Sequence, residues 1–324
     1  MTILPWQHAD WQHLSRYLIQ QRIPQALLIS GNKGIGKQVL ALNFAHALLC
    51  EQPKQDFSAC ETCHSCLLLK AGTHPDFMLV QPEEGKTSIA IDQIRNLIVK
   101  LSLKPQFERY RVVILSPADK MNTASSNAFL KCLEEPNERT VILLVTDKPS
   151  KLPATIRSRC QKLIMPLPEH DVALSWLKQQ IPNDAEILLS LAQGAPLFAL
   201  DYAQQELLSL RNQCFGQWLS VAKREIHPVI VAEQWLKHAE SPLLFWMTSW
   251  VVDLIRCSYA SSANNLYNFD LQVTLQDLST RTNVFKLYQL YDLLLISRVR
   301  LDTQVNKQAL FEEILLQWLK LNRS

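Results

Sequence analysis

The first residues whose types and spacing could do chemistry lie between Gly31 and Lys37. They follow the pattern G-x-x-x-x-G-K, in which glycines let backbone N–H groups close around phosphate and the lysine contacts the β and γ oxygens. The pattern requires Ser or Thr next, because that hydroxyl binds Mg²⁺, and this chain has Gln38 instead. The candidate nucleotide-binding residues are therefore Gly31, Gly34, Gly36 and Lys37, without the metal-binding hydroxyl.

The second nucleotide element of such a site is an apolar strand that ends in an acid for the metal and an acid that activates water. Here the strand "RVVIL" (111–115) is followed by Ser116 and Pro117, which carry no charge. Asp119 lies farther along, and we interpret it as a solvated or helix-capping residue. We therefore expect the loop to keep its shape and to have lost hydrolysis. Whether Lys37 still holds ATP passively stays open.

Four cysteines lie within seventeen positions, in the order C-x9-C-x2-C-x2-C: Cys50, Cys60, Cys63 and Cys66. Four thiolates at short spacing are typical of a closed, tetrahedral, structural Zn²⁺ site. A redox pair is the alternative for C-x-x-C, but three overlapping cysteines and a fourth upstream favour a tetrad. His64 lies between two of these ligands, and we expect it to face solvent, the alternative being that it replaces one of the cysteines.

The elements that must position these residues are predicted from apolar patterns. Short apolar runs alternate with helical patterns between Ala26 and Met165, which predicts a parallel sheet covered by helices on both faces. The predicted strands are "ALLIS" (26–30), "FMLV" (77–80), "RVVIL" (111–115), "VILLV" (141–145) and "KLIM" (162–165). Beyond the proline-rich stretch 166–171 the spacing is helical to the end.

Composition limits the class of protein. The chain has 324 residues, of which 48% are apolar, and its 33 basic and 30 acidic residues leave a net charge of +3. Bulk charge therefore does not predict wrapping of nucleic acid. No signal-peptide pattern is present, and the longest apolar run, 243–255, is too short and too polar for a membrane helix. We expect a cytoplasmic bacterial protein, with that run as a buried helix.

The combined motifs resemble a known family: the clamp-loader ATPases of bacterial DNA polymerase III, within the AAA+ class. The resemblance rests on the order of phosphate loop, cysteine module, "GTHPD" (72–76), "NAFLKCLEEP" (127–136) and "LPATIRSRC" (152–160). It implies an α/β plus all-α fold with three domains. These are an AAA+-type sheet domain with the zinc module (1–165, module 50–66), a small helical lid (166–205) and a helical collar that oligomerises (206–324).

The sequence departs from the family's motor subunit at three places: Gln38, Ser116-Pro117, and Leu197 in place of a lid arginine. Arg159 of "SRC" is retained, and the resemblance implies that it is an arginine finger for a neighbour's nucleotide. The chain would then be a subunit without ATPase activity of its own in a DNA-directed DNA polymerase holoenzyme. Its implied partners are the motor subunits (gamma/tau) and the delta subunit in a hetero-oligomeric ring, and indirectly the sliding clamp and primer-template DNA.

Two alternative functions follow from the same residues. An active ATPase motor of this family would need the missing hydroxyl and acid. A zinc-dependent DNA-binding protein would need a basic, aromatic surface around the module, where "DFSACETCHSC" (56–66) has Asp56 and Glu61 instead.

Several other residues have two interpretations each. Thr146 could sense a γ-phosphate or cap a turn, and Glu134 with Glu135 could be catalytic or only end a helix before Pro136. We expect Asp76 to tie a loop at the start of a strand. Two basic clusters could contact DNA phosphates, although solvated surface is the simpler interpretation for most members: Lys100, Lys104, Arg109, Arg111 and Lys148, Lys151, Arg157, Arg159, Lys162.

Overall fold

The computed structural model describes residues 3–102, 104–107, 109–134, 139–239, 241–259, 266–301 and 305–322. The chain divides into two compact units, 1–176 and 177–324. The division into three domains at 165 and 205 stays a prediction. Each unit is described by itself below.

The first unit contains a parallel sheet of five strands among the described residues, in the order β2-β3-β4-β1-β5. The strands are β1 (Ala26–Ser30), β2 (Phe77–Val80), β3 (Arg111–Leu115), β4 (Thr140–Thr146) and β5 (Gln161–Ile164). The predicted strands are thus confirmed, with ends that differ by at most one residue. The three central strands β3, β4 and β1 are fully buried, whereas the edge strands β2 and β5 are partly exposed.

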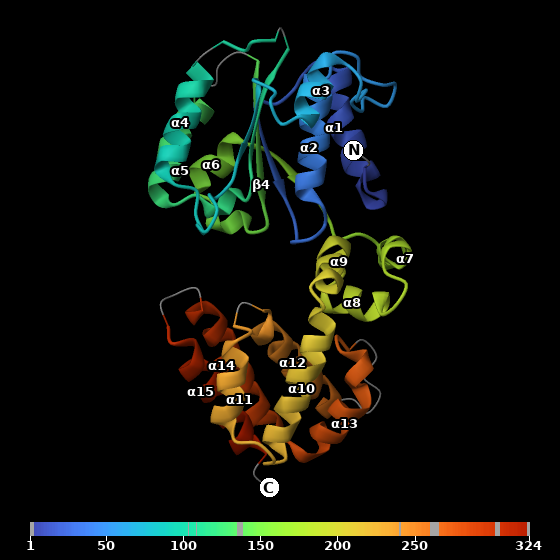
Figure 1. Cartoon of the computed structure of the whole chain (residues 1–324), viewed down its shortest axis with the longest axis vertical. Helices are drawn as coiled ribbons and strands as arrows, with labels where there is room; N and C mark the ends of the chain where they lie inside the picture. Colours follow the sequence, from blue (N-terminus) through green and yellow to red (C-terminus); the bar gives the residue numbers. More distant parts are fainter. Residues whose placement is uncertain are drawn as a thin grey trace. The chain divides into compact units, whose positions relative to one another are not determined.

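Helices cover both faces of this sheet, as Figure 1 shows. On one side are α1 (His8–Ile19), α2 (Lys37–Leu49) and α3 (His64–Lys70), preceded by the 3-10 turn η1 (Pro5–Gln7). On the other side are α4 (Ile91–Ser102), α5 (Thr123–Glu134) and α6 (Ala154–Arg159), whose apolar side chains share one core with the strands. Short turns η2 (Ala118–Lys120) and η3 (Pro149–Lys151) follow β3 and β4.

All the secondary-structure elements described in the second unit are helices. Helix α7 (His170–Gln180) spans the division between the units. It is followed by α8 (Ala185–Leu191), α9 (Pro196–Gln204), α10 (Leu207–Ala222), α11 (Pro228–Leu236), α12 (Leu243–Tyr259), η4 (Phe269–Leu271), α13 (Gln272–Arg281), α14 (Val284–Arg300) and α15 (Lys307–Leu321). The predicted α/β plus all-α composition is confirmed.

The core of the second unit is rich in tryptophan. The rings of Trp218 and Trp318 stack with centroids 3.7 Å apart, and Trp318 Nε1 donates to the carbonyl oxygen of Trp218. Trp246 and Trp250 on α12 are also fully buried, which confirms the prediction that 243–255 is a buried helix. No helix of the described residues is long and apolar enough to cross a membrane.

Candidate functional site

The phosphate-loop motif is folded as a loop between β1 and α2. Gly31, Gly34 and Gly36 have φ angles of +154°, +80° and +85°, which side chains rarely adopt. A Cβ atom on Gly31 would lie 2.5 Å from the carbonyl oxygen of Met165. The glycines therefore let the loop close tightly between β1 and the end of β5, as the sequence predicts.

The positive charge of the loop lysine is balanced by a carboxylate of the same chain. Lys37 is 5% exposed, and its Nζ lies 2.6 Å from Oδ1 of Asp147 and also donates to the carbonyl oxygen of Asn32. Sequence reasoning missed Asp147. It directly follows β4, which neighbours β1, so the shared carboxyl edge of these parallel strands could have indicated it.

The two departures from a working nucleotide site contact each other. Ser116, which stands where the metal-binding acid is required, donates its hydroxyl to Oε1 of Gln38 at 3.2 Å. Gln38 stands where the metal-binding hydroxyl is required. A neutral hydrogen bond thus joins the two positions that a hydrolysing enzyme uses to hold Mg²⁺.

Asp119 and Thr146 form a second pair beside the loop. Thr146 Oγ1 donates to Asp119 Oδ1 at 2.6 Å and accepts from the backbone N–H of Lys148 at 3.0 Å. The interpretation of Asp119 as solvated or helix-capping is therefore wrong, because the fold brings the ends of β3 and β4 together. Thr146 caps its own turn, which confirms one of the two interpretations given above.

The N-terminal residues fasten the loop from the other side. Gln7 is fully buried, and its Nε2 donates to the carbonyl oxygens of Gly36 at 2.8 Å and Ile35 at 3.2 Å. Trp6 Nε1 donates to the same Ile35 oxygen at 2.9 Å. Sequence reasoning missed both residues, since nothing local in "PWQ" indicates a partner almost thirty residues away.

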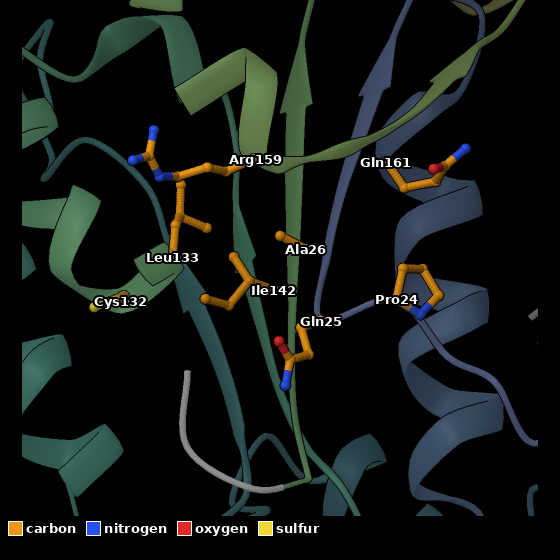
Figure 2. Close-up of a pocket in the computed structure, with 8 residues that line it drawn as sticks. All are labelled: Pro24, Gln25, Ala26, Cys132, Leu133, Ile142, Arg159 and Gln161. Atoms are coloured by element: carbon orange, nitrogen blue, oxygen red, sulfur yellow. The ribbon is translucent and has the colours of Figure 1, made fainter. Parts of the chain in front are cut away.

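Arg159 lies near the amino ends of the strands, whereas the phosphate loop lies at the carboxyl ends. It ends α6, two residues before β5, and β5 begins beside Leu27 near the start of β1. About 10 Å of strand separates Leu27 from Ser30, after which the loop begins. Arg159 also lines a cavity of about 180 Å³ with residues from α5, from the start of the neighbouring strands and from the segment before β1, drawn in Figure 2: Pro24, Gln25, Ala26, Cys132, Leu133, Ile142 and Gln161.

The guanidinium of Arg159 makes two hydrogen bonds to the part of the chain that the structure describes. Nη2 donates to Oε1 of Glu134 at 2.8 Å, and Nη1 donates to the carbonyl oxygen of Thr155 at 3.0 Å. The two side chains are 38% and 49% exposed, so the pair lies at the surface. Helix α5 ends at Glu134, whereas Glu135, the second member of the predicted carboxylate pair, and Pro136 lie outside the described residues.

The four predicted cysteine ligands converge. All four Sγ atoms lie within 4.8 Å of one another, with 4.0 Å between Cys50 and Cys63 and 3.9 Å between Cys60 and Cys66. A tetrahedral Zn–S₄ site with bonds of about 2.3 Å requires sulfur atoms about 3.8 Å apart, so the spacing fits a tetrahedral metal. None of the four forms a disulfide. His64 is exposed and lies outside the cluster, as predicted.

Backbone N–H groups and nearby elements support this cluster. The N–H groups of Cys60 and Cys63 point at the Sγ atoms of Cys50 and Cys60, at 3.2 and 3.3 Å. Hydrogen bonds from Thr62 lower the pKa of Cys60 to about 5, while burial raises the pKa of Cys50 and Cys66. Four such thiols can bind a metal.

One predicted surface residue is in fact part of the core. Arg111 is 4% exposed, and its Nη2 donates to Oδ1 of Asp76 at 3.2 Å and to the carbonyl oxygen of Lys104. The prediction that Arg111 belongs to a surface cluster that contacts DNA is therefore wrong. Asp76 also accepts from the N–H groups of Gln106 and Phe107, which confirms that it ties a loop at the start of a strand.

Comparison with known proteins identifies the family. The family described as "DNA polymerase III, delta subunit" matches residues 6–168, and "DNA polymerase III, delta subunit, C terminal" matches residues 205–320. A DNA polymerase III subunit delta' from Pseudomonas aeruginosa is 35% identical, with 98% of each chain covered. The chain belongs to the DNA polymerase III delta' subunit family. A second delta' relative, from Yersinia pestis, is 33% identical over 98% of this chain and 96% of its own.

Among solved structures, a DNA polymerase III gamma subunit-related protein from Thermotoga maritima is similar over 97% of this chain and 99% of its own. It is 20% identical, with a TM-score of 0.48. Membership of the delta' family, together with the parallel sheet and the helical second unit, agrees with the AAA+-type fold implied by the resemblance.

Proposed function

We propose that this chain is a non-hydrolysing subunit of the DNA polymerase III clamp loader and that it donates Arg159 to a nucleotide bound by a neighbouring subunit. Membership of the delta' family supports the place in the clamp loader. The observation that supports an arginine finger is the position of Arg159 near the amino ends of the strands, away from the chain's own phosphate loop at their carboxyl ends. An arginine at that position points away from this chain's own phosphate loop, which favours action on a nucleotide held by another chain.

The absence of hydrolysis is supported by the contacts at the loop. Lys37 is neutralised by Asp147, and Gln38 is hydrogen-bonded to Ser116. Neither motif position offers Mg²⁺ its usual ligand, because Gln38 stands where the hydroxyl is required and Ser116 where the acid is required. These contacts favour the non-hydrolysing subunit over the active ATPase motor.

We infer that the metal at the cysteine cluster is zinc and that its role is structural. Four cysteine ligands leave no open position for a substrate or water. The ligands would be Cys50, Cys60, Cys63 and Cys66. The acidic residues Asp56 and Glu61 beside them disfavour a zinc-dependent DNA-binding protein.

The partners follow from the proposed place in the clamp loader. They are the motor subunits (gamma/tau) and the delta subunit, in a hetero-oligomeric ring that opens the sliding clamp and loads it on primer-template DNA. The bacterial cytoplasm is the compartment in which such a complex works.

The test is substitution of Arg159 in the complete clamp loader. Arg159→Ala should leave assembly intact and lower the clamp-stimulated ATPase and loading rates by about tenfold or more, because an arginine finger can contribute ~10³-fold. Arg159→Lys should fail almost as badly, since an ammonium cannot reproduce a planar fork across phosphate oxygens. Both rates are measured after assembly has been verified by gel filtration.

The matched control is Lys37→Ala in the same complex. We expect it to leave loading largely unchanged, because this chain's own loop does no chemistry. Normal ATPase and loading rates with Arg159→Ala in an assembled complex would contradict the finger and leave the chain a scaffold.

A further inference from the structure

We infer that Glu134 is a positioning residue for Arg159: its carboxylate holds the guanidinium in the direction from which it reaches the neighbour's nucleotide. The inference rests on the proposed role of Arg159. It assigns a function to the acidic end of α5, which the phosphate loop and the cysteine cluster do not use.

The contact is specific in its geometry. Glu134 is the last residue of α5 and Arg159 the last of α6, and these helices lie on the same face of the sheet and share one core. Phe129 and Ile156, which are fully buried in that core, fix the two helices. The 2.8 Å hydrogen bond between Nη2 and Oε1 therefore joins the ends of two rigid elements.

A second contact defines the direction of the side chain. Nη1 donates to the carbonyl oxygen of Thr155 one turn earlier in α6, while Nη2 donates to Glu134. Among the described residues, two of the five N–H donors of the guanidinium are thus used. A long side chain with high rotamer entropy is held in one orientation, and the donors without a hydrogen bond to the described residues can serve phosphate oxygens.

Burial indicates that the pair serves orientation more than stability. Arg159 is 38% exposed and Glu134 49% exposed, and exposed ion pairs add little to folding. Loss of the carboxylate should therefore not unfold the chain. It should cost the orientation of the guanidinium, which affects only the step that uses it.

The experiment compares variants of Glu134 in the complete clamp loader. Glu134→Ala should lower the clamp-stimulated kcat for ATP by about two- to fivefold, the size of an exposed ion pair, with an unchanged KM. Glu134→Gln keeps an oxygen acceptor at the same reach and should restore most of the rate. The matched control is Asp92→Ala, which removes an exposed carboxylate that lies 3.2 Å from an arginine, Arg95, and should change nothing.

A double variant separates this inference from the proposed function. In the Arg159→Ala background, Glu134→Ala should have no further effect, because the residue acts through the arginine. If Arg159→Ala lowers the rate but Glu134→Ala does not, the positioning role is wrong and the finger stands. A higher rate with Glu134→Ala would also overturn the inference, because it would show that the carboxylate withholds the guanidinium. A normal rate with Arg159→Ala alone would remove the proposed function itself.

Discussion

At the scale of single residues, the side chains at the nucleotide-binding positions of the loop are bonded to other residues of the chain. Asp147 forms an ion pair with Lys37, the residue that would bind phosphate. Ser116 donates a hydrogen bond to Gln38, which stands at the metal-binding position. A working loop leaves these groups free for its ligand. Here both groups already have partners within the chain.

The Lys37–Asp147 pair should therefore contribute to stability. Asp147→Asn keeps the side-chain shape and removes the charge, which leaves the buried ammonium without its counter-charge. We expect the free energy of unfolding to fall by about 1–3 kcal/mol, since Asp147 itself is 35% exposed and partly screened. Urea unfolding followed by circular dichroism measures this.

Asp92→Asn is the control for that variant. Asp92 pairs with Arg95 at 3.2 Å, and both side chains are more than half exposed, so its loss should change the unfolding free energy by less than about 0.5 kcal/mol. Equal effects of the two substitutions would show that the pair at the loop has no special weight.

At the scale of elements, the closeness of the loop to β5 depends on a missing side chain. Gly31→Ala would place a Cβ atom 2.5 Å from a backbone oxygen, and backbone cannot move aside cheaply. We expect a loss of about 2 kcal/mol or more in the free energy of unfolding. Thermal and urea unfolding check it.

Gly216→Ala is the opposite case. Gly216 lies inside α10 with nothing within 4 Å of the point that an added methyl group would occupy, so alanine should stabilise the helix by about 0.5–1 kcal/mol. If both glycine variants destabilised the chain alike, close approach at Gly31 would not be the reason for its glycine.

The cysteine cluster is a local element whose order should depend on its metal. Removal of zinc by a chelator should speed amide hydrogen exchange across 50–66 far more than in β4, because the binding energy of the metal is local folding energy. Metal analysis should give one Zn²⁺ per chain. A folded, zinc-free preparation with four titratable thiols in this segment would contradict the prediction.

At the scale of the whole molecule, the chain should be inert alone and active only in the complex. We expect no ATP turnover by the isolated chain, because the hydroxyl and the acid that hold Mg²⁺ and activate water are both missing. A coupled ATPase assay on the purified chain measures it. Turnover that survives further purification and disappears in Lys37→Ala would show that the loop still does chemistry.

Much of this fold could be predicted from local patterns. The apolar runs indicated all five described strands, because parallel strands buried on both faces need continuous Val, Ile and Leu. The short spacing of Cys60, Cys63 and Cys66 indicated a common site, because three ligands so close in the chain cannot lie far apart in space. The loop glycines were found for the same reason.

The polar pairs between distant residues could not be predicted in this way. Gln38 meets Ser116 across 78 positions, Arg111 meets Asp76 across 35 and Arg159 meets Glu134 across 25. Periodicity shows which face of an element is apolar, but it does not show which polar group of another element lies opposite. The sequence by itself therefore determined that the hydrolytic groups are missing. Only the packing of the strand and helix ends decided which groups the replacing residues contact, because hydrogen bonds between distant residues form where the tertiary fold brings their atoms within about 3 Å.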